Sequence, residues 1–331
     1  MKNLIQLLQK VGINGFLLGL FGAIFLAWLF PTIGSTESGF PWKSIINVGI
    51  ALVFFFYGVK LNPMQLREGL ANWKLHVLIQ SITFIIFPVV VFFLLQLIPW
   101  IDDDFKLGIT YLSALPSTVS ASVVMVSIAG GNMPSAIFNA SISSLLGVFI
   151  TPIWMGILGE STGGMEIDMM PTILELTFKV ILPVCLGVLL HGKFFPLIEN
   201  HLKKLKYVDQ TVIMMIVFTA FSDSFSQGVF APYKTETLIQ VAFIMLSLFL
   251  FIWTLIWIFS NVLGFTLKDR ITALFCGSKK SLVHGVVIGK ILFPDPALLG
   301  LVLLPVMLYH IQQLIIGSAI AQYFSRKTEA S

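Results

Sequence analysis

The chain has 331 residues, of which 57% are hydrophobic and 11% charged, with a formal net charge of +4. Soluble domains are about half apolar and about a quarter charged, so this composition excludes an ordinary soluble protein and indicates that the lipid bilayer is the solvent. The net positive charge is explained by loop lysines and arginines that orient helices in a membrane, and it gives no reason to expect a nucleic-acid partner.

The sequence contains no His-Glu-x-x-His, no Walker-type loop and no Cys/His cluster with metal spacing. We therefore expect neither an enzyme nor a resident cofactor.

Apolar runs separated by polar breaks predict ten membrane spans. Each should be helical, because lipid offers no hydrogen-bond partner to open backbone. In chain order the expected spans are 12–31, 44–61, 74–99, 107–129, 134–157, 172–192, 209–228, 237–264, 271–292 and 297–323. One transmembrane domain is expected to cover 1–331.

The basic residues alternate between connections as the predicted helices alternate direction. They gather at the N-terminus, after the second span, in the loop 193–206, before the ninth span and in the C-terminal tail, whereas the opposite connections hold acidic groups such as Asp102 to Asp104. The positive-inside rule places the basic side in the cytoplasm. Both termini are thus expected in the cytoplasm, with the chain in a bacterial inner (plasma) membrane.

Ten helices with both ends on one side divide into two groups of five, and the odd number gives the second group the opposite topology. We expect repeat one at about 1–160 and repeat two at about 165–331. Small polar residues interrupt the fourth span around Thr118 and the ninth around Ser278, at positions about half the chain apart. Such paired interruptions are typical of broken helices at a midplane binding site.

Hydroxyl side chains surround the fourth span instead of following one stripe. They either line a site or allow close helix packing with local hydrogen bonds. The preceding Pro116 and the matching ninth-span break favour a site. The hydroxyl residues concerned are Ser117, Thr118, Ser120 and Ser122.

In the ninth span, Lys279 and Lys280 form a charged island between Ser278 and Ser281. An ammonium group deep in a span is costly and faces a cavity or a partner. The alternative is that the span begins later and both side chains reach the cytoplasmic interface. If they are deep, either lysine would bind an anionic substrate, neutralise a neighbour such as Asp223, or exchange a proton during transport.

A hydroxyl and an amide in the fifth span indicate a cation site. Ser135 and Asn139 are one helical turn apart and share a face, and their oxygen atoms suit a hard cation. Interhelical hydrogen bonding is the alternative. Gln80 and Thr83 in the third span repeat this signal more weakly, and the other secondary candidates are Asp223, His284 and His310.

At these residues the chain resembles the bile acid:sodium symporter family, most closely its divergent symporter-like branch. The resemblance covers nearly the whole chain and is carried most specifically by 115–122, 130–132 with 136–139, Thr151-Pro152, and 276–282. It implies ten helices in panel and core domains, broken helices four and nine that cross, and a substrate site beside the crossing. It also implies that Ser135 and Asn139 match fifth-helix sodium ligands, with Gln80 or Thr83 matching one in the third helix.

The ninth helix departs from the sodium-coupled members, which place Glu before Gly-Met-Gln-Asn-Ser, since 276–281 offers two ammonium groups and no carboxylate. We therefore predict a secondary transporter of a small organic anion by alternating access, in which Lys279 or Lys280 replaces bound sodium. Coupling would then be to a proton or absent. The alternatives are a sodium-coupled organic anion symporter and a non-transporting membrane regulator that signals through the basic loop 193–206.

Overall fold

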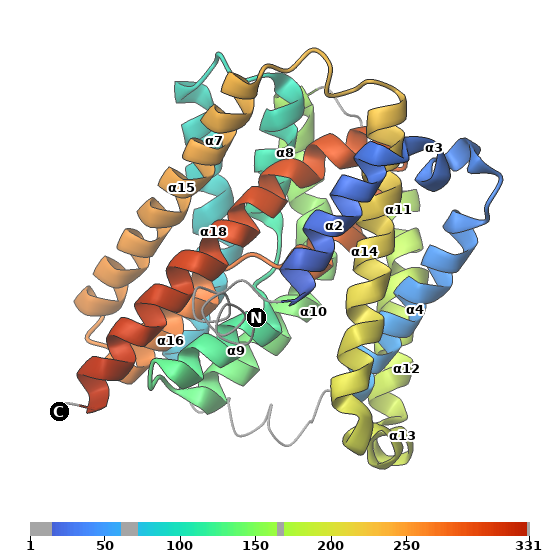
Figure 1. The fold of residues 1–331 in the computed structure, drawn as a ribbon. Coiled ribbons are helices and arrows are strands. Elements are labelled where there is room, and N and C mark those ends of the chain that lie inside the picture. Colours follow the sequence, from blue (N-terminus) through green and yellow to red (C-terminus); the bar gives the residue numbers. More distant parts are fainter. Residues whose placement is uncertain (1–14, 61–71, 164–168, 330–331) are drawn as a thin grey trace, which may run out of the picture.

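The structure is a computed structural model, and it describes residues 15–60, 72–163 and 169–329. All regular elements in these ranges are helices (Figure 1). The first half contains α2 (Gly15–Leu29), α3 (Pro31–Gly34), α4 (Trp42–Lys60), α6 (Trp73–Ser81), α7 (Phe87–Leu97), α8 (Asp103–Ala114), α9 (Val119–Ile128) and α10 (Met133–Gly163). A 3-10 turn (Thr36–Ser38) precedes α4, and a π-helical segment (Ile82–Ile86) joins α6 to α7.

In its described residues, the second half of the chain also consists of α-helices with one 3-10 turn and one π-helical segment. It contains α11 (Met169–Leu176), a π-helical segment (Thr177–Ile181), α12 (Leu182–Leu189), α13 (His191–Ile198), a 3-10 turn (Glu199–His201), α14 (Leu202–Ser226), α15 (Thr235–Val262), α16 (Leu267–Gly277), α17 (Leu282–Leu292) and α18 (Pro296–Glu329). The chain bends by 86° where α12 gives way to α13. The long helices lie side by side and form one bundle (Figure 1).

Several of these helices are long and apolar enough to cross a bilayer. Among the described residues seven meet that test, and the bent pair around Leu190 raises the count to eight. Large apolar side chains face outward, such as Trp28, Phe93 and Phe243 at 60%, 61% and 68% exposure, as a lipid-facing surface requires. The chain is therefore an all-α integral membrane protein, as predicted. The count of ten spans stays a prediction, because α2 is described for 15 residues only and a break divides α8 from α9.

The first break has a local cause. Proline lacks an amide hydrogen and disfavours helical geometry in the residue before it. Leu115, which precedes Pro116, is extended at φ −68° and ψ 149°, and α8 ends at Ala114. The next helix begins at Val119, so residues 115–118 form a non-helical segment where the sequence predicts one.

The second break, residues 278–281, lies against the first. The Ser281 amide donates to the Pro116 carbonyl at 2.9 Å, and the Ser122 hydroxyl donates to the Phe275 carbonyl at 2.9 Å. Beyond the break, the Ser281 hydroxyl accepts from the His284 amide and caps α17, which satisfies a donor that a helix start leaves free. Two segments separated by half the chain thus form one centre.

Candidate functional site

Lys280 lies at this centre in a cage of carbonyl oxygens. Its Nζ donates to the carbonyls of Ser113 (2.6 Å), Leu115 (2.8 Å) and Thr83 (2.8 Å) and lies 4.2 Å from the centre of the Phe87 ring. A charged ammonium has three N–H donors, which matches the number of carbonyl acceptors. The side chain is 1% exposed, which excludes the interfacial position considered from sequence.

Each carbonyl of the cage is free for a structural reason. In the π-helical segment the Phe87 amide bonds to the Ile82 carbonyl, which leaves the Thr83 carbonyl without its regular helical partner. Ser113 lies in the last turn of α8 and Leu115 directly follows the helix, where carbonyls have no partner within the helix. The amide of Ser117 donates to the Ser143 hydroxyl at 2.9 Å and not back to Ser113. A helix C-terminus also carries partial negative charge that stabilises a cation.

Side chains of α18 hold the backbone of the second break. The Gln313 amide accepts from the Lys280 N–H and donates to the Lys280 carbonyl, both at 2.8 Å, so it replaces the two bonds that a continuous helix would supply. The Tyr309 hydroxyl donates to the Ser278 carbonyl at 2.6 Å. The Ser278 hydroxyl donates to the Leu274 carbonyl in the last turn of α16. These contacts hold the break in a non-helical conformation although it contains no proline.

Lys279 contacts a different set of groups from its neighbour Lys280. It is 0% exposed. Among the described residues, its Nζ finds a single hydrogen-bond acceptor, the sulfur of Met125 on α9, and it lies 5.5 Å from the centre of the Phe275 ring. The two neighbouring lysines therefore occupy very different surroundings.

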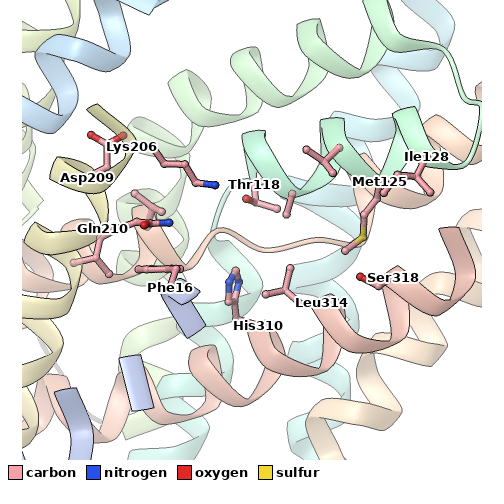
Figure 2. A pocket seen from close by; sticks show the side chains of 14 residues that line it. Phe16, Thr118, Met125, Ile128, Lys206, Asp209, Gln210, His310, Leu314 and Ser318 are labelled. Carbon is pink, nitrogen blue, oxygen red and sulfur yellow. The ribbon is translucent and has the colours of Figure 1, made fainter. Parts of the chain in front are cut away.

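A cavity of about 350 Å³ lies along α9 on the Met125 side. Figure 2 shows its walls: Thr118, Met125 and Ile128 from α9 and its start, His310, Leu314 and Ser318 from α18, and Lys206, Asp209 and Gln210 from α14. The Lys206 side chain extends from α14 toward Thr118 (Figure 2). Asp209 is paired with Lys60 of α4 at 3.2 Å, which offsets its negative charge at the cavity wall.

The predicted cation-site residues come together between α6 and α10. The Gln80 amide donates to the Asn139 backbone carbonyl (3.1 Å) and Oδ1 (3.2 Å), and the Asn139 amide donates to the Ser135 carbonyl and contacts His76 Nδ1, both at 2.8 Å. Interhelical hydrogen bonding, the alternative considered from sequence, is thus present here. Thr83 contributes its carbonyl to Lys280, while its hydroxyl donates to the Ile79 carbonyl.

The remaining candidates are distributed around the break. His284 packs against Phe54 and Tyr57 of α4, with ring centres 5.8 and 6.0 Å apart, and its Nδ1 lies 3.0 Å from the Ser281 hydroxyl. The Ser117 hydroxyl is buried and lacks a hydrogen-bond partner among the described residues. The side chain of Ser120 lies outside the described part of the structure.

Asp223 does not neutralise the lysines. One of its carboxylate oxygens accepts from the Thr36 amide and hydroxyl, at 2.9 and 3.0 Å, and the residue is 1% exposed. The expectation that it pairs with Lys279 or Lys280 is not met, and its burial also excludes simple contact with external water. None of the ion pairs found among the described residues involves these three side chains.

Sequence reasoning missed several residues of the site. Gln313, which holds the Lys280 backbone, was not among the site residues predicted from sequence. Tyr309, Met125 and His76 were not proposed at all. A tyrosine in an apolar helix requires a partner for its hydroxyl, so Tyr309 carried a signal, whereas Met125 was indistinguishable from a lipid-facing methionine.

A Gly-x-Ser-x-Gly sequence occurs at residues 159–163. It forms the last turn of α10, whereas the nucleophile of a hydrolase needs a strand-to-helix turn at this motif. The motif therefore gives no support to an enzyme.

Long apolar helices around two broken segments that meet define an integral membrane protein of the transporter class. The model of the SBF-like CPA transporter family matches residues 14–326, and the chain belongs to this family. The predicted relationship to the bile acid:sodium symporters is thereby confirmed.

Relatives share this similarity over almost their whole length. An uncharacterized protein of Pseudomonas aeruginosa is 37% identical over 322 residues, which cover 96% of this chain and 94% of the relative. The "Putative symporter YfeH" of Escherichia coli K12 is 32% identical over 323 residues, 96% of this chain and 94% of the relative. Sodium/bile acid cotransporter 7 of Rattus norvegicus is also 32% identical over 323 residues, 95% of this chain and 93% of the relative.

Proposed function

We propose that this protein is a secondary transporter of small organic anions that works by alternating access, with the ammonium of Lys280 in the place of a coupling sodium ion. The observation that carries the proposal is the carbonyl cage around Lys280. Three carbonyl oxygens at 2.6 to 2.8 Å surround this cation at the contact of the two breaks. A covalently attached cation neither enters nor leaves, so this position would not couple transport to a sodium gradient.

The cavity supports an anionic substrate. Thr118 occupies the N-cap position of α9 and makes no side-chain capping bond, so the partial positive charge of that helix end faces the cavity. Lys206 and His310 also line it. The other walls are largely apolar, and a volume of about 350 Å³ falls at the lower end of the range for small-molecule sites. A small carboxylate or sulfonate with an apolar body fits this description.

The topology in this proposal is that of ten spans in two inverted five-helix repeats. The spans would be α2, α4, α6 with α7, α8 with α9, and α10, followed by α11 with α12, α14, α15, α16 with α17, and α18. Broken spans four and nine would then cross at their contact, and one group of helices would move against the other. The basic connections support cytoplasmic termini, and the bacterial relatives support an inner-membrane location.

Sodium-coupled symport is the second candidate, and the Gln80–Asn139 cluster favours it. The Gln80 Oε1 atom is buried and lacks a partner among the described residues. Rotation of this amide by half a turn would direct Oε1 toward the two Asn139 oxygens that its nitrogen now contacts. Three oxygen ligands would then be available for a hard cation.

Uptake by purified protein in proteoliposomes tests the proposal. The substrate would be an equimolar mixture of small aromatic and aliphatic carboxylates and sulfonates, with internal contents measured by mass spectrometry. We expect at least one anion to accumulate above protein-free vesicles, with the same rate in a sodium or a potassium gradient. A rate that requires sodium and is lost in Asn139→Ala would establish the second candidate instead. No uptake of any anion in either gradient would overturn transport and favour a membrane regulator.

A further inference from the structure

The contrast between the two buried lysines extends the proposed function. Lys280 is supplied with three oxygen acceptors, whereas the single acceptor found for Lys279 in the described structure is a thioether sulfur. A thioether is a weak acceptor, and a buried cation without an oxygen partner or a countercharge is costly. An anion bound beside Lys279 would therefore reduce the free-energy cost of burying its ammonium group.

The Met125 side chain lies between α9 and α18 and links the Lys279 ammonium to the cavity. Met125 contacts Nζ through its sulfur and also lines the cavity. Figure 2 shows the Met125 side chain between α9 and α18, close to Leu314 and Ser318. Methionine is unbranched and has three rotatable bonds, so this cover moves without any change of backbone.

Gly317 provides the space in which this pair of side chains fits. A Cβ atom at this position would lie 2.9 Å from the Met125 sulfur and 3.3 Å from the Lys279 Nζ. Gly317 lies between Leu314 and Ser318 in the sequence of α18, and those two residues line the cavity. The Lys279 ammonium thus lies against the helix that forms one wall of the cavity.

We propose that Lys279 is the residue that binds the anionic group of the substrate, and that the Met125 side chain covers it while the cavity is empty. A carboxylate or sulfonate entering along α9 displaces the thioether and pairs with the ammonium, while its apolar body stays among Ala121, Val124 and Leu314. The titratable groups near Lys279 are Cys276 in the last turn of α16, His310 on α18 and the adjacent Lys280. This inference rests on the proposed function, since it names the binding group of the same cavity.

Chemical labelling tests the inference without a known substrate. The probe is 2,4,6-trinitrobenzenesulfonate, itself an aromatic sulfonate, which arylates an uncharged amine with loss of sulfite. Protein in lipid nanodiscs would be labelled at pH 8.5, and each lysine quantified by peptide mass spectrometry. Lys206, exposed on the cavity wall, reports entry of the reagent. Lys280, which is as deeply buried as Lys279, is the comparison.

We expect Lys279 to be labelled at least tenfold faster than Lys280, and Met125→Ala to raise the Lys279 rate several-fold. Met214→Ala is the matched control, since Met214 packs against Gly19 of α2 and does not line the cavity. Benzenesulfonate should protect Lys279 several-fold, whereas uncharged nitrobenzene should not. None of these results depends on transport, so labelling that succeeds while uptake fails would separate this inference from the proposed function.

Three results would overturn the inference. The first is equal labelling of Lys279 and Lys280 in wild type and in Met125→Ala. The second is a Lys279 rate that Met125→Ala and Met214→Ala change alike. The third is selective labelling of Lys279 that benzenesulfonate and nitrobenzene affect equally, since the position would then be accessible but would not bind an anion.

Discussion

At the scale of single residues, the stability of the Lys280 position depends on two opposing free energies, the cost of burying the ammonium and the contribution of its hydrogen bonds. Burying an ammonium without a countercharge costs several kcal/mol. Each of its three hydrogen bonds contributes about 1.5 to 3 kcal/mol, because the donor is charged, so the cage offsets most of the cost of burial. Removing the side chain would leave three buried carbonyls at the centre without a partner, and each of these costs about 1 to 3 kcal/mol.

We therefore expect the stability of the Lys280→Ala variant to depend on a bound cation. The vacated space retains the carbonyls of Thr83, Ser113 and Leu115, which suit sodium or ammonium. The melting temperature of the variant should rise with sodium or ammonium chloride at fixed ionic strength, by the equivalent of about 2.7 kcal/mol at a hundredfold excess over the dissociation constant. Wild type and Lys279→Ala, which keep the cage filled, should show no such rise. An equal response in all three proteins would contradict the cage.

At the scale of elements, helices in this fold are positioned by interruptions and by close backbone approach. Pro88 follows the first π-helical segment and cannot donate to the Phe84 carbonyl, four residues earlier. The indole N–H of Trp154 on α10 donates to that carbonyl instead, at 2.6 Å. Between α4 and α12, Gly58 and Gly187 let the two backbones touch, since a Cβ on either would overlap a carbonyl oxygen of the other helix. Packing of this kind is a main source of helix association in lipid.

Gly58→Ala should therefore separate α4 from α12. The obstacle is the backbone of Val184, which cannot rotate away, so we expect a loss of about 1 to 3 kcal/mol, as for other overpacked sites. Gly22→Ala is the matched control, because a Cβ there meets nothing within 4 Å. Thermal unfolding in a single detergent measures both. Equal melting temperatures for the two variants would show that this approach is not tight in the membrane protein.

At the scale of the whole molecule, polar contacts join the two halves of the chain at three places. One of them is the contact between the two breaks. Near the start of α16, Asp269 accepts from Asn72 (3.1 Å) and Asn132 (2.9 Å). At the start of α8, Asp104 accepts from the hydroxyl of Tyr233, which lies in the connection between α14 and α15, at 2.6 Å.

The Tyr233 contact predicts a loss of stability at high pH. Partial burial, the hydrogen bond to Asp104 and the charges of Asp104 and Asp102 raise the Tyr233 pKa above its ordinary value of 10.0. The folded state therefore favours the protonated phenol, and this contribution is complete below about pH 10 and lost as the pH rises further. Melting temperatures between pH 8 and 11 should fall more steeply for wild type than for Tyr233→Phe. Tyr323→Phe, which changes an exposed tyrosine, should follow wild type. Parallel curves for wild type and Tyr233→Phe would refute the coupling.

The sequence by itself determined the solvent and the positions of the interruptions. Apolar runs identified the membrane helices, because lipid imposes one backbone solution on any spanning segment. Pro116 placed the first break, since its effect on Leu115 is local. The spacing of Ser135 and Asn139 placed both on one face of α10. The motifs around residues 115–122 and 276–282 identified the family to which the chain belongs.

Only the tertiary structure decided what Lys279 and Lys280 contact. Although adjacent in a non-helical segment, they contact different parts of the fold. One meets carbonyls freed by a π-helical segment and by the end of α8, and the other meets Met125 beside a cavity. The partners come from residues up to 197 positions away, and several of them are backbone atoms, which every residue type carries alike. A sequence pattern therefore cannot show which carbonyl is free, because that depends on the hydrogen bonds of the folded chain.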